Sequence, residues 1–83
     1  MKISYFDLAL LLTIARLGDK ANGPAIRLGL CEFDNMAPPV MKVHVALTKL
    51  KKSNLIVSRR EEEKTYFWLT KAGRALLAIG DAS

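Results

Sequence analysis

Two short stretches near the end of the chain constrain its fold most, because together they predict a β-hairpin. Residues 55–60 (LIVSRR) contain β-branched side chains and residues 65–69 (TYFWL) contain aromatic ones, a composition typical of strands. The four polar residues 61–64 (EEEK) lie between them and predict the hairpin tip. A two-stranded hairpin is at best marginally stable in water. The remainder of the chain must therefore provide helices on which the hairpin packs.

Two helices are predicted before residue 32. Residues 5–17 follow the capping residue Ser4 and end before Gly18, a common helix stop. Apolar side chains lie on nearly all sides of this segment, which favours a central place in the core or contact with a partner chain. Residues 24–31 predict a short second helix, because Pro24 suits the first helical position. A turn is expected at residues 32–37.

A third helix is predicted over residues 38–52 and a last one over residues 71–79. Pro38 and Pro39 suit a helix start, and Asn54 suits the left-handed conformation that often ends a helix. The third helix has a single apolar stripe made by Val43, Ala46, Leu47 and Leu50. Thr70 is expected to cap the last helix. The predicted order is thus three helices, a hairpin and a final helix.

Length and composition exclude several classes of protein. The 83 residues suit a single domain, expected over residues 1–83. One cysteine and one histidine cannot form a disulfide or an ordinary metal site, so no metal or cofactor is expected. No stretch is apolar enough for a membrane span, and no signal peptide is expected. The single cysteine suits a reducing setting, so we expect a cytoplasmic protein. We find no catalytic motif and therefore expect that the protein is not an enzyme.

The positive charge is concentrated in one part of the chain. The formal net charge is +5, and the segment from Asn35 to Arg60 has no acidic residue. It contains six basic residues, namely Lys42, Lys49, Lys51, Lys52, Arg59 and Arg60. Such a segment suits a phosphate-facing surface. The alternative is a solvated basic face that keeps the protein soluble.

Two strings within residues 36–77 match a known pattern. The string at 47–56 (LTKLKKSNLI) resembles a helix that ends Leu-x-x-Leu-x-x-x-Gly-Leu-Ile and passes into a strand, with Asn54 in the place of the usual glycine. The string at 66–77 (YFWLTKAGRALL) resembles a second strand followed by Leu-Thr-x-x-Gly-Arg and a helix. In this order, the two strings resemble the winged-helix regulators of the MarR and PadR types, in which the two strands form the wing. The resemblance implies an α+β, mainly helical, winged helix-turn-helix. Its three-helix core would carry a two-stranded wing and a C-terminal helix.

The resemblance also implies a regulator of transcription that binds double-stranded DNA. Helix 38–52 would be the recognition helix in the major groove, with the wing near the backbone. A homodimer is implied, here through helix 1, the C-terminal helix or both, because long terminal helices are absent from the sequence. The wing tip of such proteins is usually basic or glycine-rich, whereas here it carries Glu61, Glu62 and Glu63.

Candidate DNA contacts follow from the side of the third helix that faces away from its apolar stripe. The base-facing candidates are Met41, Lys42, His44, Val45 and Thr48. The phosphate candidates are Lys49, Lys51, Lys52, Arg59 and Arg60.

An alternative function is a winged-helix module that binds protein, as an adaptor, an antirepressor or a subunit of a larger complex. Met41 and Val45 and the acidic wing tip motivate it, because two exposed apolar side chains also suit a protein contact. The aromatic residues 66–68 are expected to alternate between core and surface of the hairpin. Cys31 is expected to be a small core residue.

Overall fold

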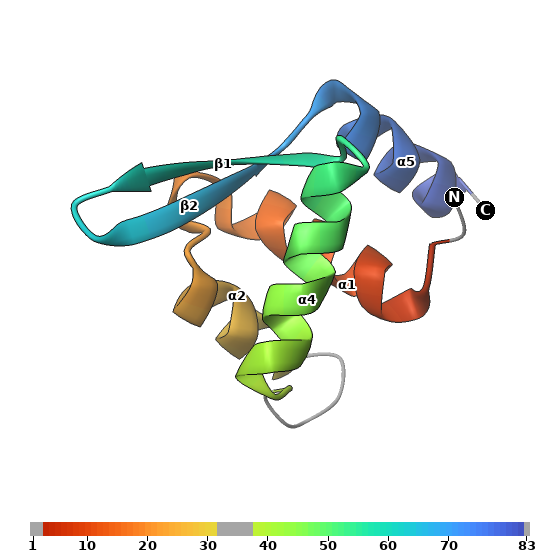
Figure 1. The fold of residues 1–83 in the computed structure, drawn as a ribbon. Coiled ribbons are helices and arrows are strands. Elements are labelled where there is room, and N and C mark those ends of the chain that lie inside the picture. The colour runs from red at the N-terminus through yellow and green to blue at the C-terminus, as the bar shows by residue number, and fades with distance from the viewer. Residues whose placement is uncertain (1–2, 32–37, 83) are drawn as a thin grey trace.

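The computed structural model describes residues 3–31 and 38–82, so the turn expected at 32–37 lies outside the described residues. Its elements are α1 (Tyr5–Leu17), the 3₁₀ turn η1 (Gly18–Lys20), α2 (Gly23–Gly29), α4 (Val40–Lys52), β1 (Ile56–Glu61), β2 (Lys64–Leu69) and α5 (Lys71–Ala82) (Figure 1). The two strands pair in antiparallel orientation, as a hairpin. The predicted mainly helical α+β arrangement with a two-stranded wing is confirmed. Within the described part of the chain, none of the helices has the length and hydropathy of a membrane span.

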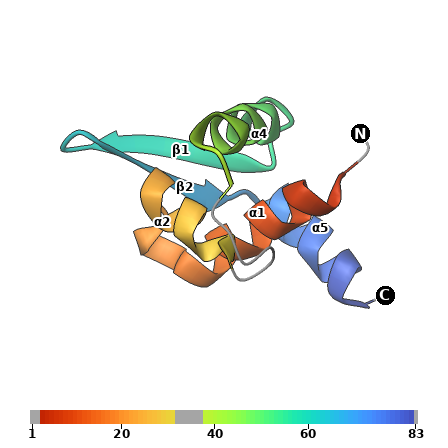
Figure 2. The same cartoon turned by 90° about the horizontal axis from the view of Figure 1, so that it is seen from below.

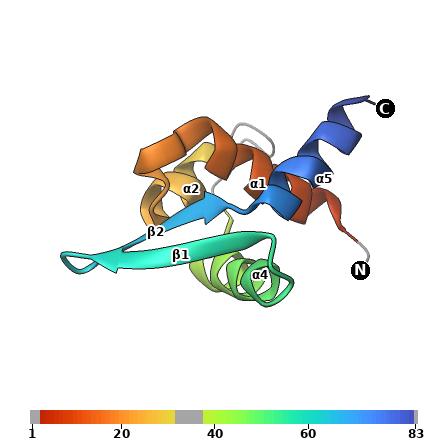
Figure 3. The ribbon, with the colours of Figure 1, turned by 90° about the horizontal axis from the view of Figure 1, so that it is seen from above.

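The core is centred on α1. Leu10 and Leu11 are completely buried and Ile14 nearly so, and each such side chain contributes about 1.5–3 kcal/mol to folding. Figures 2 and 3 show α4 and β1 on one side of the molecule and α1, α2 and α5 on the other. The central position expected for the first helix is therefore confirmed. Ala15 is an exception to the burial of this helix, since its side chain is exposed.

Side-chain caps start the first two helices as the sequence predicts. The Ser4 hydroxyl accepts a hydrogen bond from the Asp7 amide (3.1 Å), and the Asp7 carboxylate accepts one from the Ser4 amide (3.4 Å). The Asn22 side chain accepts from the Ala25 amide at 3.0 Å. The second helix ends at Gly29, two residues before its predicted end.

The third helix begins two residues later than predicted, at Val40. Pro39 has φ −57° and ψ 143°, so it is the extended residue that precedes the helix, and its carbonyl accepts from the Val43 amide at 3.2 Å. The reason lies in the proline pair. A residue that precedes proline is held away from the helical region by the proline ring, so Pro38 cannot begin the helix.

The end of α4 is fixed by backbone hydrogen bonds. The Asn54 amide donates to the Lys51 carbonyl and the Leu55 amide to the Leu50 carbonyl, each at 3.0 Å. Asn54 has φ 61°, the left-handed conformation expected of it. Together these contacts form a Schellman motif, which turns the chain from α4 directly into β1.

The start of α5 packs against the same turn. The Thr70 amide donates to the Leu55 carbonyl at 3.1 Å, and the Thr70 hydroxyl donates to the Asn54 carbonyl at 2.7 Å. The Thr70 hydroxyl also accepts from the Gly73 amide, as the predicted cap of α5. A Cβ atom at Gly73 would lie 2.2 Å from the Leu55 carbonyl oxygen. A glycine is therefore required at this close approach of α5.

The hairpin has one face on the core and one turned away from it. Ile56 is opposite Leu69 and Ser58 opposite Phe67, and the apolar members of these two pairs pack on the helices. The other face carries Tyr66 and Trp68, with ring centroids 6.3 Å apart. The alternation expected of the aromatic residues is therefore present.

The hairpin tip is a two-residue turn. Glu62 and Glu63 connect the strands with φ values of 47° and 70°. Two consecutive positive φ values are typical of a type I′ turn, in which Asn-Gly is the favoured sequence. The triply acidic tip therefore has left-handed backbone at residues that carry long side chains.

Candidate nucleic-acid interface

The exposed surface of α4 divides into three strips around its buried stripe. The stripe consists of Val43, Ala46, Leu47 and Leu50, as predicted. Of the remaining residues, one group faces α1, a second faces the hairpin and α2, and a third points outward. This division separates the candidate contacts that the sequence grouped together.

The outward strip carries Met41, Val45 and Lys52. Met41 is 68% exposed and Val45 is 59% exposed, so both are open to solvent. Lys52, seven residues after Val45, lies on the same side of the helix and is also exposed. These are the side chains of α4 that a flat or convex partner would contact first.

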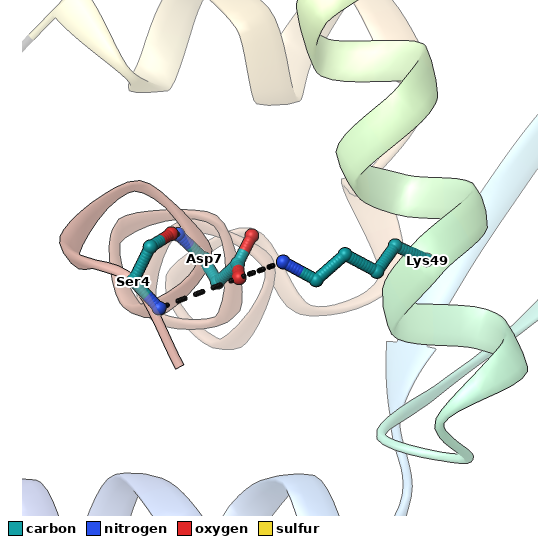
Figure 4. A network of polar contacts seen from close by, with 3 residues as sticks. All are labelled: Ser4, Asp7 and Lys49. Carbon is teal, nitrogen blue, oxygen red and sulfur yellow. Dashed lines mark hydrogen bonds and ion pairs between the residues drawn. The ribbon is translucent and has the colours of Figure 1, made fainter. Parts of the chain in front are cut away.

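The strip toward α1 holds two of the predicted DNA contacts. The Lys49 ammonium lies 2.8 Å from a carboxylate oxygen of Asp7, whose side chain is 3% exposed (Figure 4). The Lys42 ammonium lies 4.6 Å from the centre of the Phe6 ring, a cation–π contact. The ion pair competes with the phosphate contact expected of Lys49. The aromatic contact similarly draws Lys42 away from the outward strip.

The strip toward the hairpin lines a groove of about 750 Å³. α4 contributes His44, Thr48 and Lys51, which face α2 and β2 across this groove. The Thr48 hydroxyl donates to the His44 carbonyl at 2.9 Å, so its proton is engaged and its oxygen is left as an acceptor. As the base-facing residue that the sequence predicts, Thr48 would therefore accept a hydrogen bond from a base donor such as an exocyclic amine.

Two further cationic side chains line the groove, and the sequence did not single them out as DNA contacts. Arg27 comes from α2, where its Nε donates to the Pro38 carbonyl at 2.6 Å. Lys64 comes from the start of β2, and Glu63 lies next to it. The acid-free segment that drew attention to the other cations ends at Arg60, so neither residue fell within it.

The two arginines of β1 lie on opposite faces of the hairpin. Arg59 is paired in register with Tyr66 and contacts Glu61 at 3.3 Å, on the face turned away from the groove. Arg60 is paired with Thr65, a groove residue, and by the alternation of side chains it shares that face. Of the two, Arg60 is the one placed to add charge beside the groove.

Potential metal ligands are scattered over the described part of the chain. Among the residues that the structure describes, no group of three His, Cys, Asp or Glu side chains lies close enough to bind a metal ion. Cys31, two residues after the end of α2, is half-buried.

Solved structures with the same fold are known, although the sequence itself matches little. No family model matches it, and no curated protein is significantly similar to it. H. salinarum RosR superposes with a TM-score of 0.89 over 98% of this chain and 73% of the RosR chain, at 16% identity. A PadR family transcription regulator from Clostridium difficile gives 0.83 over 95% of this chain and 85% of its own, at 22% identity.

A third structure is that of BpsR from Bordetella bronchiseptica, whose DNA binding is regulated by 6-hydroxynicotinic acid. It gives a TM-score of 0.81 at 18% identity, over 98% of this chain and 54% of the BpsR chain. The fold is thus that of winged-helix regulators, and the resemblance to regulators of this type is confirmed at the level of the fold.

Proposed function

We propose that this protein binds double-stranded DNA as a regulator of transcription, with α4 in the major groove and the wing beside the backbone. The observation that carries the proposal is the cationic groove that α2, α4 and the hairpin form beside the outward strip of α4. Arg27, Lys51 and Lys64 meet there from three elements that are distant in sequence. The same function is supported by two proteins that share this fold, the DNA-binding protein BpsR and the PadR family transcription regulator.

The three strips of α4 support a division of the candidate contacts by the partner that each can reach. Residues of the outward and groove strips would meet base edges, and the lysines at the C-terminal end of α4 would meet phosphate. The base-facing set is Met41, His44, Val45 and Thr48, and the phosphate set is Lys51, Lys52 and Arg60 with Arg27 and Lys64 added. Lys42, Lys49 and Arg59 contact DNA only if they leave their present partners.

The same proposal includes a homodimer, formed through α1, α5 or both, in the cytoplasm and without enzymatic activity or a cofactor. A two-fold dimer would place two copies of α4 on successive turns of one face of the duplex, about 34 Å apart. Light scattering on the free protein tests this part, and a monomer mass in the presence and absence of duplex would exclude it.

The proposal is tested by duplex binding as a function of salt. The logarithm of affinity should fall linearly with the logarithm of salt concentration, with a slope of about −0.9 per phosphate contacted. Lys51→Ala should reduce this slope by about 0.9, because it removes one groove cation. Lys71→Ala is the matched control, since Lys71 is an exposed lysine of α5 that does not line the groove. Absence of retardation of any duplex at low salt would exclude DNA binding.

A second candidate function is a protein-binding module, favoured by the exposed apolar end of α4. Val40 is 64% exposed, next to Met41, and the acidic wing tip stands at the far end of the hairpin. These features suit a partner with a complementary apolar and basic surface. Loss of duplex binding in the experiment above, combined with a stable protein complex that Met41→Ala weakens, would establish this function instead.

A further inference from the structure

The outward strip of α4 is apolar at Met41 and Val45, and its one cation, Lys52, lies in the last turn of the helix. Met41 and Val45 are both more than half exposed, and neither has a hydrogen-bonding group that could read a base. Both side chains point away from the buried stripe of α4, so within the described part of the molecule neither is packed in the core. Two large apolar side chains side by side on an exposed helix suit an apolar partner.

The cations that would read guanine are held to either side of this strip. Lys42 lies over the Phe6 ring and Lys49 is paired with the Asp7 carboxylate, so both side chains lean toward α1. Lys51 faces the groove on the opposite side. A bidentate contact to the acceptor atoms of guanine needs a cationic side chain at the centre of the reading face, and none of these three occupies it. His44 also lines the groove, and Lys52 lies in the last turn of α4, away from the N-terminal part of the helix that meets base edges.

We infer that α4 recognises thymine through Met41 and Val45, which contact the C5 methyl groups in the major groove. The thymine methyl is the one apolar group that a base pair presents in that groove, so it is the natural partner of an apolar strip. Lys51, on the groove side of this strip, is complementary to the phosphates that flank the base edges. This inference rests on the proposed function and adds the base that the protein prefers and the residues that choose it.

The test compares thymine with uracil, which differs only in lacking the C5 methyl group. Short duplexes are first selected from a random pool by the wild-type protein, and the selected sequence is then prepared with deoxyuridine in place of thymidine. We expect thymine to be enriched in the selected duplexes. The uracil duplex should bind about fourfold more weakly for each thymine methyl group that the protein contacts, the ratio that corresponds to burying one methyl-sized group.

Variants assign the effect to the two side chains. The double variant Met41→Ala, Val45→Ala should bind the thymine and uracil duplexes with equal affinity, and its helix content should be unchanged because both positions are exposed. Lys51→Ala is the control, since it should weaken both duplexes alike and leave their ratio intact.

Two results overturn the inference, and they are distinguishable from failure of the proposed function. Equal affinity of the wild-type protein for thymine and uracil duplexes would leave DNA binding intact and refute recognition of thymine methyl groups by Met41 and Val45. Persistence of the thymine preference in the double variant would place methyl recognition elsewhere. Failure to bind any duplex at low salt would instead refute the proposed function itself.

Discussion

Replacement of Gly73 by alanine should destabilise the protein severely, although the residue lies within a helix. The new Cβ would lie 2.2 Å from the Leu55 carbonyl oxygen, and real Cβ atoms essentially never come closer than 3.0 Å. The oxygen belongs to the backbone of the turn between α4 and β1, which the Schellman motif holds in place. The clash therefore cannot be relieved by rotating a side chain, and α5 has to move by about 1 Å.

The size of the effect follows from the contacts that this movement disturbs. Overpacking at a well-packed site costs about 1–3 kcal/mol. Two hydrogen bonds from Thr70 to the turn, at 3.1 Å and 2.7 Å, are strained or broken at about 1 kcal/mol each. The higher helix propensity of alanine relative to glycine offsets about 1 kcal/mol of this loss. The expected net loss is about 2–4 kcal/mol in the free energy of unfolding.

Urea unfolding monitored by circular dichroism measures this loss, and thermal unfolding should show a decrease in Tm of more than about 8 °C. Gly23→Ala is the matched control, because nothing lies within 4 Å of the position its Cβ would occupy. That variant should change stability by less than about 1 kcal/mol. Equal stability of the two variants would refute the assignment of Gly73 to a close approach between α5 and the turn.

Three other substitutions test separate contacts. Lys49→Met should lower the free energy of unfolding in urea by about 1–2 kcal/mol, because the buried Asp7 carboxylate loses its ammonium partner. An unchanged free energy of unfolding would show that the pair is not formed in solution. Glu63→Gly should stabilise the hairpin by about 1 kcal/mol, since φ is 70° there, and an unchanged urea midpoint would contradict the left-handed turn. Gly29→Ala would place a Cβ 2.6 Å from the Thr13 methyl group and should therefore destabilise the protein. Stability should recover when Gly29→Ala is combined with Thr13→Ser, which removes that methyl group. Absence of this recovery would contradict the contact.

Local features of this fold were predictable from sequence because their causes are local. The capping box of Ser4 and Asp7, the left-handed Asn54 and the apolar stripe of α4 each depend on residues within one or two turns of chain. The strands were predictable for the same reason, from β-branched and aromatic side chains in two short runs. The later start of α4 shows the limit, since the constraint that Pro39 places on Pro38 outweighed the general suitability of proline for a helix start.

The candidate site was harder to predict because its composition depends on contacts between distant residues. Lys49 looked like a phosphate contact by its place on α4, and its pairing with Asp7, 42 positions away, is visible only in three dimensions. Arg27 lines the groove because α2 and α4 lie on either side of it, an arrangement that no spacing in the sequence indicates. Helical periodicity predicts the face of α4 on which each side chain lies. The neighbours that each face contacts depend on the tertiary fold.

The turn between α4 and β1 also limits how the length of this domain can vary. Residues 53–55 have their three amides bonded to α4, and the carbonyls of Asn54 and Leu55 accept from Thr70. One inserted residue here would separate these groups from their partners and tilt the whole hairpin. An insertion between Glu62 and Glu63 would disturb only the two-residue turn. Added or deleted residues are therefore tolerated at the outer end of the wing, where they change how far it extends but not the direction in which it leaves α4.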